Sequence, residues 1–570
     1  MSTIERYGSF LPDERCFELR TEPPRKWFNC LFNRIGDWEM WNECTHLGDG
    51  FIRIRDRTGN QLNLTKWDSK YVYIRDEGDG SVFCPFGEPG PSPVEDRFAR
   101  FYAGRTLIGC KHGPLKVRQR IFVPWDDPVE IWTVTVENTG SDVREVSVFG
   151  YAMFDLTGTD DEGNGFWKET ICEMDEALHG AYCHNRLPGH PFDWGNGYFA
   201  TTTADAYRGG EGYRDHFLRQ DFSVGSPRIL DPEYNCRNLP GYGPDCAGAV
   251  QCRLHIPPGE SRRVDFVLGC AGSLDRAREA VAGLTAETID RLDAERQAIE
   301  RDFADRFTID IGHDQYNSLF NWFIKHHLYG YLINKSGFRD NLQTDAALAL
   351  VDYDVARDNF LRALASQKPS GEVPHGFRPL NRLTYSDKPA WIFFTLSQLI
   401  KESGDWDLLD VEVPYFESDQ VGTVWEHAVR TMEYLATDLG THGLCDQHHA
   451  DWNDGLAATP ESGDRESVMV TEQFCYGLRE MAEMADRRRD GETAARAREL
   501  YDQFRDRLNN VAWDGQWYVR TICGDGYRIG SDDNPYGKIF QNTQSWAVLS
   551  GVAEGERAVE VMDQVETQLK

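Results

Sequence analysis

The chain has 570 residues, 40% of them hydrophobic, and a formal net charge of −32. That length predicts several domains with sizeable cores rather than one domain. The negative charge excludes nucleic-acid binding, which needs a basic surface to neutralise phosphates, and disfavours attachment to anionic membranes.

The first residues, the apolar runs and the cysteines predict an intracellular protein. No apolar run approaches the roughly 18 residues of a membrane span. The first residues, MSTIERYGSFLPDERCFEL, lack the cationic-then-apolar order of a signal peptide. The 14 cysteines are scattered without a CxxC pair, which favours buried thiols over metal ligands or disulfides. We therefore expect a cytoplasmic protein.

Residues 1–270 predict a β domain. Short runs of alternating or β-branched residues recur between turns rich in Gly, Pro, Asn and Asp, a pattern typical of antiparallel strands. The clearest runs are at 51–64, 71–76, 115–124, 130–140, 144–154, 197–204, 249–260 and 261–272. So many short strands indicate a large antiparallel sandwich.

The pattern changes to a helical period near residue 273. Residues 271–310, rich in Ala and charged residues, predict a helical linker, and residues 311–570 predict about eight helices. The expected helices cover 314–335, 342–367, 387–404, 420–440, 467–490, 492–513 and 542–570, the last range holding more than one. A sandwich followed by a ring of paired helices is the natural architecture. A helical repeat solenoid is the alternative, but no fixed-period repeat is present.

Two segments carry residues suited to sugar chemistry. They are SGFRDNLQTD (336–345) and DQHHADWNDGL (446–456), which place acids beside Arg or Trp in turn-like surroundings. Cleavage of a glycosidic bond needs a carboxylic acid that protonates the leaving oxygen, together with groups that hold the ring. From spacing alone, however, Asp451 and Asp454 fit a turn or a helix cap equally well.

These segments resemble signature segments of the inverting β-glycoside phosphorylase family, the cellobiose, cellodextrin and N,N′-diacetylchitobiose phosphorylases of glycoside hydrolase family 94. The resemblance continues in the same order through YGSF, KWFNCL, FVPWDDPVEIW, WDGQWYVR and QNTQSWAVLSG. It therefore covers nearly the whole chain. It implies an N-terminal antiparallel β-sandwich, a helical linker and an (α/α)6 barrel.

The resemblance also implies roles for individual residues. Asp454 matches the family's general acid, and Trp452 matches a residue lining the donor-sugar subsite. Arg339 and Asp340 match the pair that holds the hydroxyls of the donor ring, whereas Asp451 matches a structural position. Inorganic phosphate is then a co-substrate, no cofactor is expected, and the protein is expected to be a homodimer. His448 and His449 lack spaced partners for a metal site, so no metal is expected.

The chain departs from the family pattern at three places. An Arg that precedes the FRD segment in well-known members has no match at Asn334, Lys335 or Ser336. The family's LQD sequence is interrupted here by Thr344. Family members also continue beyond the equivalent of Lys570 with acceptor- and phosphate-binding residues, so we expect an incomplete barrel and a chain that is inactive or nearly so.

The sequence thus predicts inverting phosphorolysis of a β-linked, cellobiose-like disaccharide to an α-sugar 1-phosphate. Two alternatives stay open. An inverting glycoside hydrolase on the same plan would need a base carboxylate, for which Glu466 and Asp345 are the candidates. A fragment that binds sugar without catalysis is the other.

Overall fold

The protein is described by a computed structural model that covers residues 6–166, 169–185, 195–219, 221, 223–457 and 464–570. The chain folds as two compact units, Met1–Asn334 and Lys335–Lys570. The boundaries near residues 270 and 310 that the sequence suggests stay predictions.

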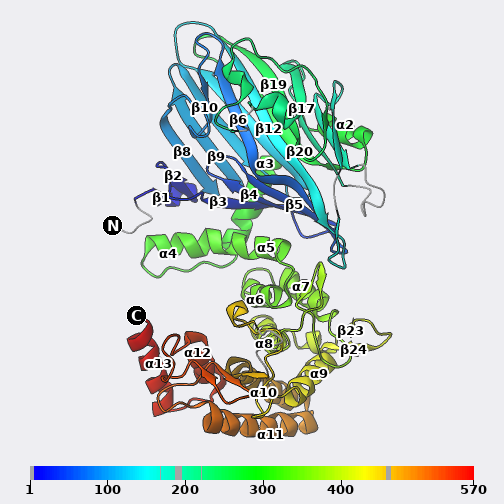
Figure 1. The fold of residues 1–570 in the computed structure, drawn as a ribbon, viewed down its shortest axis with the longest axis vertical. Helices are drawn as coiled ribbons and strands as arrows, with labels where there is room; N and C mark the ends of the chain where they lie inside the picture. Colours follow the sequence, from blue (N-terminus) through cyan, green and yellow to red (C-terminus); the bar gives the residue numbers. More distant parts are fainter. Residues whose placement is uncertain (1–5, 167–168, 186–194, 220, 222, 458–463) are drawn as a thin grey trace. The chain divides into compact units, whose positions relative to one another are not determined.

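The first unit contains two large sheets in which every recorded pairing among the described strands is antiparallel (Figure 1). One sheet has the order β1 (Gly8–Leu11), β2 (Cys16–Leu19), β8 (Glu95–Tyr102), β9 (Arg105–His112), β10 (Leu115–Phe122), β11 (Val129–Asn138), β20 (Ser261–Ala271), β16 (Asn196–Thr201), β15 (Gly180–Asn185), β14 (Thr170–Asp175) and β18 (Gly241–Tyr242). The other has the order β17 (Tyr207–Tyr213), β19 (Cys246–Ile256), β12 (Arg144–Thr159), β6 (Gln61–Asp76), β5 (Gly50–Asp56), β4 (Trp38–Thr45) and β3 (Phe28–Phe32), with β13 (Gly165–Phe166) on β12 and β7 (Val82–Phe83) on β6.

The hydrophobic core of this unit lies between the two sheets. Val117 on β10 and Trp132 on β11 belong to the same buried cluster as Ile74 on β6 and Val148 on β12. Alternate residues of a strand point to opposite faces, so each sheet contributes one apolar face to that cluster. The predicted antiparallel sandwich is confirmed.

The linker helices follow the last strand. They are α2 (Leu274–Ala282), α3 (Ala286–Asp305), α4 (Asp314–Ser318), a π-helical turn (Leu319–Ile324) and α5 (Lys325–Asn334). Ser273 and Thr285 cap α2 and α3, each accepting a hydrogen bond from the backbone three residues later. Arg296 of α3 donates to the carbonyl of Phe32 on β3, which fixes α3 against the sandwich.

The second unit is helical. Its α-helices among the described residues are α6 (Phe338–Leu348), α7 (Tyr353–Leu364), α8 (Ala390–Ser403), α9 (Val424–Thr437), α10 (Val468–Arg488), α11 (Gly491–Arg507), α12 (Gln541–Ser550) and α13 (Glu556–Leu569). Three small sheets join them: β21 (Gly376–Phe377) with β22 (Leu380–Asn381), β23 (Glu412–Pro414) with β24 (Val421–Thr423), and β25 (Arg465–Ser467) with β26 (Thr521–Cys523) and β27 (Arg528–Ile529).

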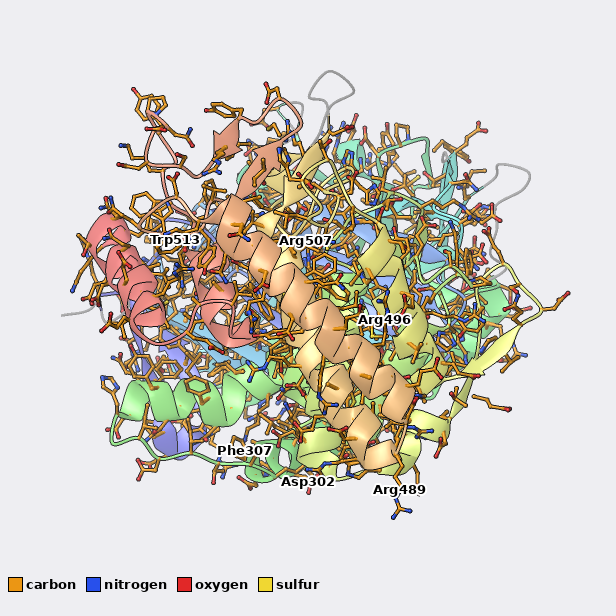
Figure 2. The ribbon with its side chains drawn as sticks, turned by 90° about the horizontal axis from the view of Figure 1, so that it is seen from below. Asp302, Phe307, Arg489, Arg496, Arg507 and Trp513 are labelled. Carbon is orange, nitrogen blue, oxygen red and sulfur yellow. The ribbon has the colours of Figure 1, made fainter. Side chains whose placement is uncertain are left out.

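These helices form an inner and an outer row. The inner helices α6, α8, α10 and α12 pack on one another in that order, whereas α7, α9 and α11 pack outside them. The sequences explain the two rows. The segment AWIFFTLSQLI of α8 is apolar on nearly all sides and mostly buried, but α11 buries only the stripe Ala494, Ala497, Leu500 and Phe504. Figure 2 shows α11 along the outside, where Arg496 pairs with Glu433 of α9.

The structure differs from the sequence-based ranges at one place that matters for the site. The single helix predicted over 342–367 is two helices, since Asp352 caps a new helix by accepting from the Val355 N–H. The first of them, α6, already begins at Phe338, so Arg339 and Asp340 lie in its first turn rather than in a loop.

Candidate functional site

The site is built on loops that precede the inner helices. The backbone of Ser336 and Gly337 pairs with the segment around Gly376: the Phe338 N–H donates to His375 O at 2.9 Å and the Phe377 N–H donates to Ser336 O at 3.0 Å. The loop before α8 is joined in turn to the loop before α10, because the Ser386 N–H donates to Ala450 O at 3.0 Å. Three segments distant in the sequence therefore meet.

Arg339 is the centre of this arrangement. Its Nη1 donates to Asp387 Oδ2 at 2.9 Å and to the carbonyl of Asp451 at 3.2 Å, and its Nη2 lies 3.5 Å from Asp454 Oδ1. Burial lowers the pKa of Arg339, but the charges of Asp387, Asp340 and Asp454, together with the hydrogen bond to Asp387, outweigh burial and the pKa is raised. Arg339 is therefore a fixed cation that links the first turn of α6 to the loops before α8 and α10.

Asp340 follows Arg339 in the first turn of α6 and is partly exposed. Its carboxylate folds back over Gly337, where a β-carbon would collide with Asp340 Oδ2. Gly337 thus leaves the space that the acid occupies, and the positive end of the helix favours a negative charge there.

The resemblance implies that Asp340 holds a donor sugar, and Gly337→Ala is expected to displace the Asp340 carboxylate. Sugar binding is then expected to weaken at least about tenfold, since a charge-assisted hydrogen bond is typically worth 1.5–3 kcal/mol. The backbone at Gly337 is in the extended region that alanine adopts, so the fold is expected to survive. Calorimetric titration with glucose checks the binding, and circular dichroism checks the fold. Unchanged glucose affinity would show that Asp340 does not hold the ring.

Asp454 and Trp452 lie on the loop before α10. Asp454 begins a short 3₁₀-helix that Asn453 caps by accepting from the Gly455 N–H at 3.0 Å. The Asp454 side chain is 68% exposed and Trp452 is 45% exposed. Arg339 contacts this loop on either side of Trp452, through the Asp451 carbonyl and the Asp454 carboxylate. An exposed acid therefore lies beside a fixed cation, and an exposed ring belongs to the same loop.

Asp451 has a different environment. Its carboxylate is fully buried and forms a two-point pair with Arg520, whose Nη1 and Nη2 donate at 2.6 and 2.5 Å. Ser467, the N-cap of α10, donates to the same carboxylate at 2.6 Å, and the Asn453 N–H donates to its other oxygen at 2.9 Å. These contacts are those of a residue that shapes the loop.

Two residues of the site could not be found by local pattern. Asp387 is fully buried and accepts from both Arg339 and the indole Nε1 of Trp391, at 2.9 and 3.0 Å. Arg520 lies 69 residues after its partner Asp451. The only signal in the sequence is that both are charged residues inside or beside strongly apolar segments.

The carboxylates named for the hydrolase alternative are both engaged elsewhere. Glu466 is buried and accepts from the backbone N–H groups of His442 and Leu444 at 2.8 and 2.9 Å. Asp345 is buried and accepts from Asn359 at 3.0 Å, and burial raises its pKa well above the ordinary range. Both hold the fold of their segments and neither is open to solvent.

No group of three or more His, Cys, Asp or Glu side chains among the described residues is arranged to hold a metal ion. His448 pairs with Asp438 at 2.6 Å. Burial lowers the pKa of His448, but the hydrogen bond to Asp438 and the charges of Asp438, Asp446 and Glu372 together outweigh burial and raise it. His449 packs against Tyr385 with ring centroids 5.4 Å apart.

Within the described part of the chain, no helix combines the length and the apolar character that crossing a bilayer requires.

Comparison with known proteins decides the family. Residues 17–287 match the supersandwich domain of glycosyl hydrolase 94, and residues 319–570 match the catalytic domain of the glycosyl hydrolase 94 superfamily. The chain is 30% identical to solabiose phosphorylase of Paenibacillus borealis over 99% of its own length and 74% of that protein. The chain belongs to glycoside hydrolase family 94. The predicted resemblance is confirmed, and with it the class of glycosyltransferase-type glycoside phosphorylases.

Other family 94 relatives act on different sugars, by their names. The chain is 27% identical to 3-O-β-D-glucopyranosyl-β-D-glucuronide phosphorylase of Paenibacillus borealis, covering 98% of this chain and 73% of that protein. It is 23% identical to N,N′-diacetylchitobiose phosphorylase of Vibrio furnissii, covering 98% and 75%. The chain thus spans about three quarters of the length of these relatives.

The fold is shared more widely. A bacterial glucoamylase in complex with acarbose superimposes with a TM-score of 0.59 at 11% identity, over 96% of this chain and 80% of that chain. At that identity the likeness shows the fold alone. It confirms the plan of a sandwich followed by helices of the (α/α)6 type.

Proposed function

We propose that this family 94 chain catalyses inverting phosphorolysis of a β-linked disaccharide, giving an α-sugar 1-phosphate, with Asp454 as the general acid. The observation that carries the proposal is the contact of Asp454 with Arg339, which is itself fixed by Asp387. Because Asp454 is exposed, a substrate can reach it, and because Arg339 is fixed, the contact with Arg339 restricts the position of the Asp454 carboxylate.

The proposed mechanism follows from charge. Asp454 donates its proton to the bridging glycosidic oxygen, while a phosphate oxygen attacks the anomeric carbon from the opposite face. Because phosphate arrives as an anion, no protein base is needed to activate it, whereas an inverting hydrolase needs a second carboxylate for water. The bound phosphate dianion also favours the protonated form of a nearby carboxyl group.

Three other side chains are proposed to hold the donor ring. Arg339 donates to a ring hydroxyl, Asp340 accepts from one, and the exposed face of Trp452 packs on the apolar face of the ring. A β-linked glucoside such as cellobiose is the proposed substrate, and the proposal is supported by relatives that are disaccharide phosphorylases by their names. Inorganic phosphate is the co-substrate and no cofactor is proposed. The homodimer and the cytoplasmic localisation expected from the sequence remain predictions.

Cleavage is expected to require phosphate. The assay uses a chain extended to the length of the curated relatives, since the 570 residues span about three quarters of that length. Cellobiose is incubated with and without inorganic phosphate, and free glucose is measured. Glucose release only with phosphate supports phosphorolysis. Equal release in both samples would support the hydrolase and refute the proposal.

A further inference from the structure

Lys388 is a buried cation that the proposed chemistry does not use. It lies two residues before α8 and its side chain is fully buried. Its Nζ has no hydrogen-bond partner among the described residues, and it lies 5.1 Å from the centroid of the Tyr385 ring. Burying an ammonium group without hydrogen bonds is costly. Its presence therefore calls for a compensating charge.

A second nitrogen without a partner lies beside it. The ring of His375 packs on Tyr385 with centroids 4.3 Å apart, and its buried Nδ1 has no hydrogen-bond partner among the described residues. Burial lowers the pKa of His375 to about 4, and the positive charges of Lys388 and Arg339 add to the shift. His375 is thus neutral near pH 7 and has one ring N–H to donate. Lys388, His375 and Arg339 bring three nitrogen donors together.

The neighbouring backbone also favours an anion. Arg339 is in the first turn of α6, and Lys388 precedes Pro389, the N-cap residue of α8. The amino end of a helix carries a partial positive charge and unpaired N–H groups, which attract anions.

The acids nearby only partly balance Lys388. Asp387 Oδ2 accepts from Arg339 and Trp391, whereas Asp387 Oδ1 is buried without a hydrogen-bond partner among the described residues. No hydrogen bond joins Lys388 to Asp387, Asp340 or Asp454. Burial lowers the pKa of Lys388 to about 8, although the charge of Asp387 opposes the shift. The ammonium therefore remains charged at neutral pH while its hydrogen bonds are unmade.

We propose that Lys388 and His375 form, beside Arg339, a subsite for an oxyanion of the ligand, either a sugar carboxylate or a phosphate group. Lysine has a flexible four-carbon stem, so its Nζ can turn from the Tyr385 ring to a ligand oxygen. This proposal adds to the proposed function and rests on it, because the subsite lies next to the sugar ring that the proposed function places there. It makes Lys388 a residue that determines which ligands the site prefers.

Binding to the 570-residue chain tests the subsite directly. Calorimetric titration at pH 7 uses glucuronate, inorganic phosphate and, as the neutral control, glucose. We expect Lys388→Met to lose about tenfold or more of the affinity for one or both anions, and to keep that for glucose, because a hydrogen bond to a charged group is lost. Lys388→Arg keeps the charge and is expected to retain most anion binding. Lys401→Met is the matched control, since Lys401 lies on α8 and is paired with Glu480 at the surface.

The two anions identify the source of the oxyanion. A loss limited to glucuronate indicates recognition of an acidic sugar, and a loss limited to phosphate indicates a contact with the co-substrate. Unchanged affinities for both anions in Lys388→Met, or no anion binding by the unmodified chain, would overturn the proposal. The titrations measure binding without catalysis, so the subsite can fail while the phosphate-dependence assay that tests the proposed function succeeds, and the reverse.

The unmodified chain supplies a second test if Lys388→Met does not fold. Glucuronate stays ionised from pH 6.5 to 9.5, whereas Lys388 loses its proton as the pH rises through about 8. Affinity for glucuronate is therefore expected to fall about tenfold across that range, with glucose affinity unchanged. Parallel behaviour of the two sugars would contradict a role for Lys388.

Discussion

Asp454→Asn is expected to remove nearly all phosphorolysis and nearly all of the reverse synthesis. An amide cannot donate a proton to the bridging oxygen, and microscopic reversibility makes the same group the base in the reverse reaction. General acid–base catalysis typically contributes about 10²–10⁴-fold, so kcat should fall by at least the lower figure. The assay follows sugar 1-phosphate formation in a chain extended to the length of the family 94 relatives.

Asparagine has nearly the same shape as aspartate, so the Asp454→Asn substitution tests the chemistry of the side chain rather than the folding of the chain. Asp454 is largely exposed, so its replacement is expected to leave the melting temperature unchanged. Asp563→Asn, an exposed acid on α13, is the control and should keep full activity. If Asp454→Asn stayed active while a stably folded Asp451→Asn lost activity, the acid would be Asp451 and our assignment would be wrong.

Asp451→Asn is expected to destabilise the helical unit strongly. The substitution leaves Arg520 fully buried without its carboxylate partner. Breaking one side of a buried ion pair typically costs about 3–5 kcal/mol. For a unit of this size such a loss lowers the melting temperature by on the order of 10 °C. Differential scanning calorimetry of the 570-residue chain measures the change.

A surface ion pair of the same unit provides the comparison. Glu483 and Arg487 of α10 are both mostly exposed and lie 3.4 Å apart. Glu483→Gln is expected to change stability by less than about 1 kcal/mol, because solvent screens exposed pairs. A melting temperature for Asp451→Asn that matches the Glu483→Gln value would show that the Asp451–Arg520 pair does not hold the loop.

The architecture was largely predictable because each element has its own local pattern. Alternating residues marked the strands of the sandwich, and the apolar runs of α8 and α10 were found within a few residues of their ends. The start of α6 was missed for a physical reason. The segment from Ser336 to Asp345 is polar and begins with Gly, but its backbone is anchored by the segment around Gly376, which only the folded chain brings near.

The site was predictable only where a motif carried it. Arg339 and Asp454 were named from a family resemblance, and the structure brings them within 3.5 Å. Asp387, Lys388 and Arg520 were missed because their roles depend on packing between helices. A buried charge has no sequence signature beyond its presence in an apolar segment, and its partner is defined by three-dimensional distance alone.

The anomeric configuration of the product tests the central claim most directly. Cellobiose and phosphate are incubated with the extended chain, and the sugar 1-phosphate, whose anomeric configuration is fixed by the ester, is examined by proton and phosphorus NMR. Attack by phosphate opposite to the bond that Asp454 cleaves predicts α-glucose 1-phosphate from the β-linked substrate. A β-configured 1-phosphate, or free glucose from both halves of the disaccharide with no phosphate ester, would contradict inverting phosphorolysis.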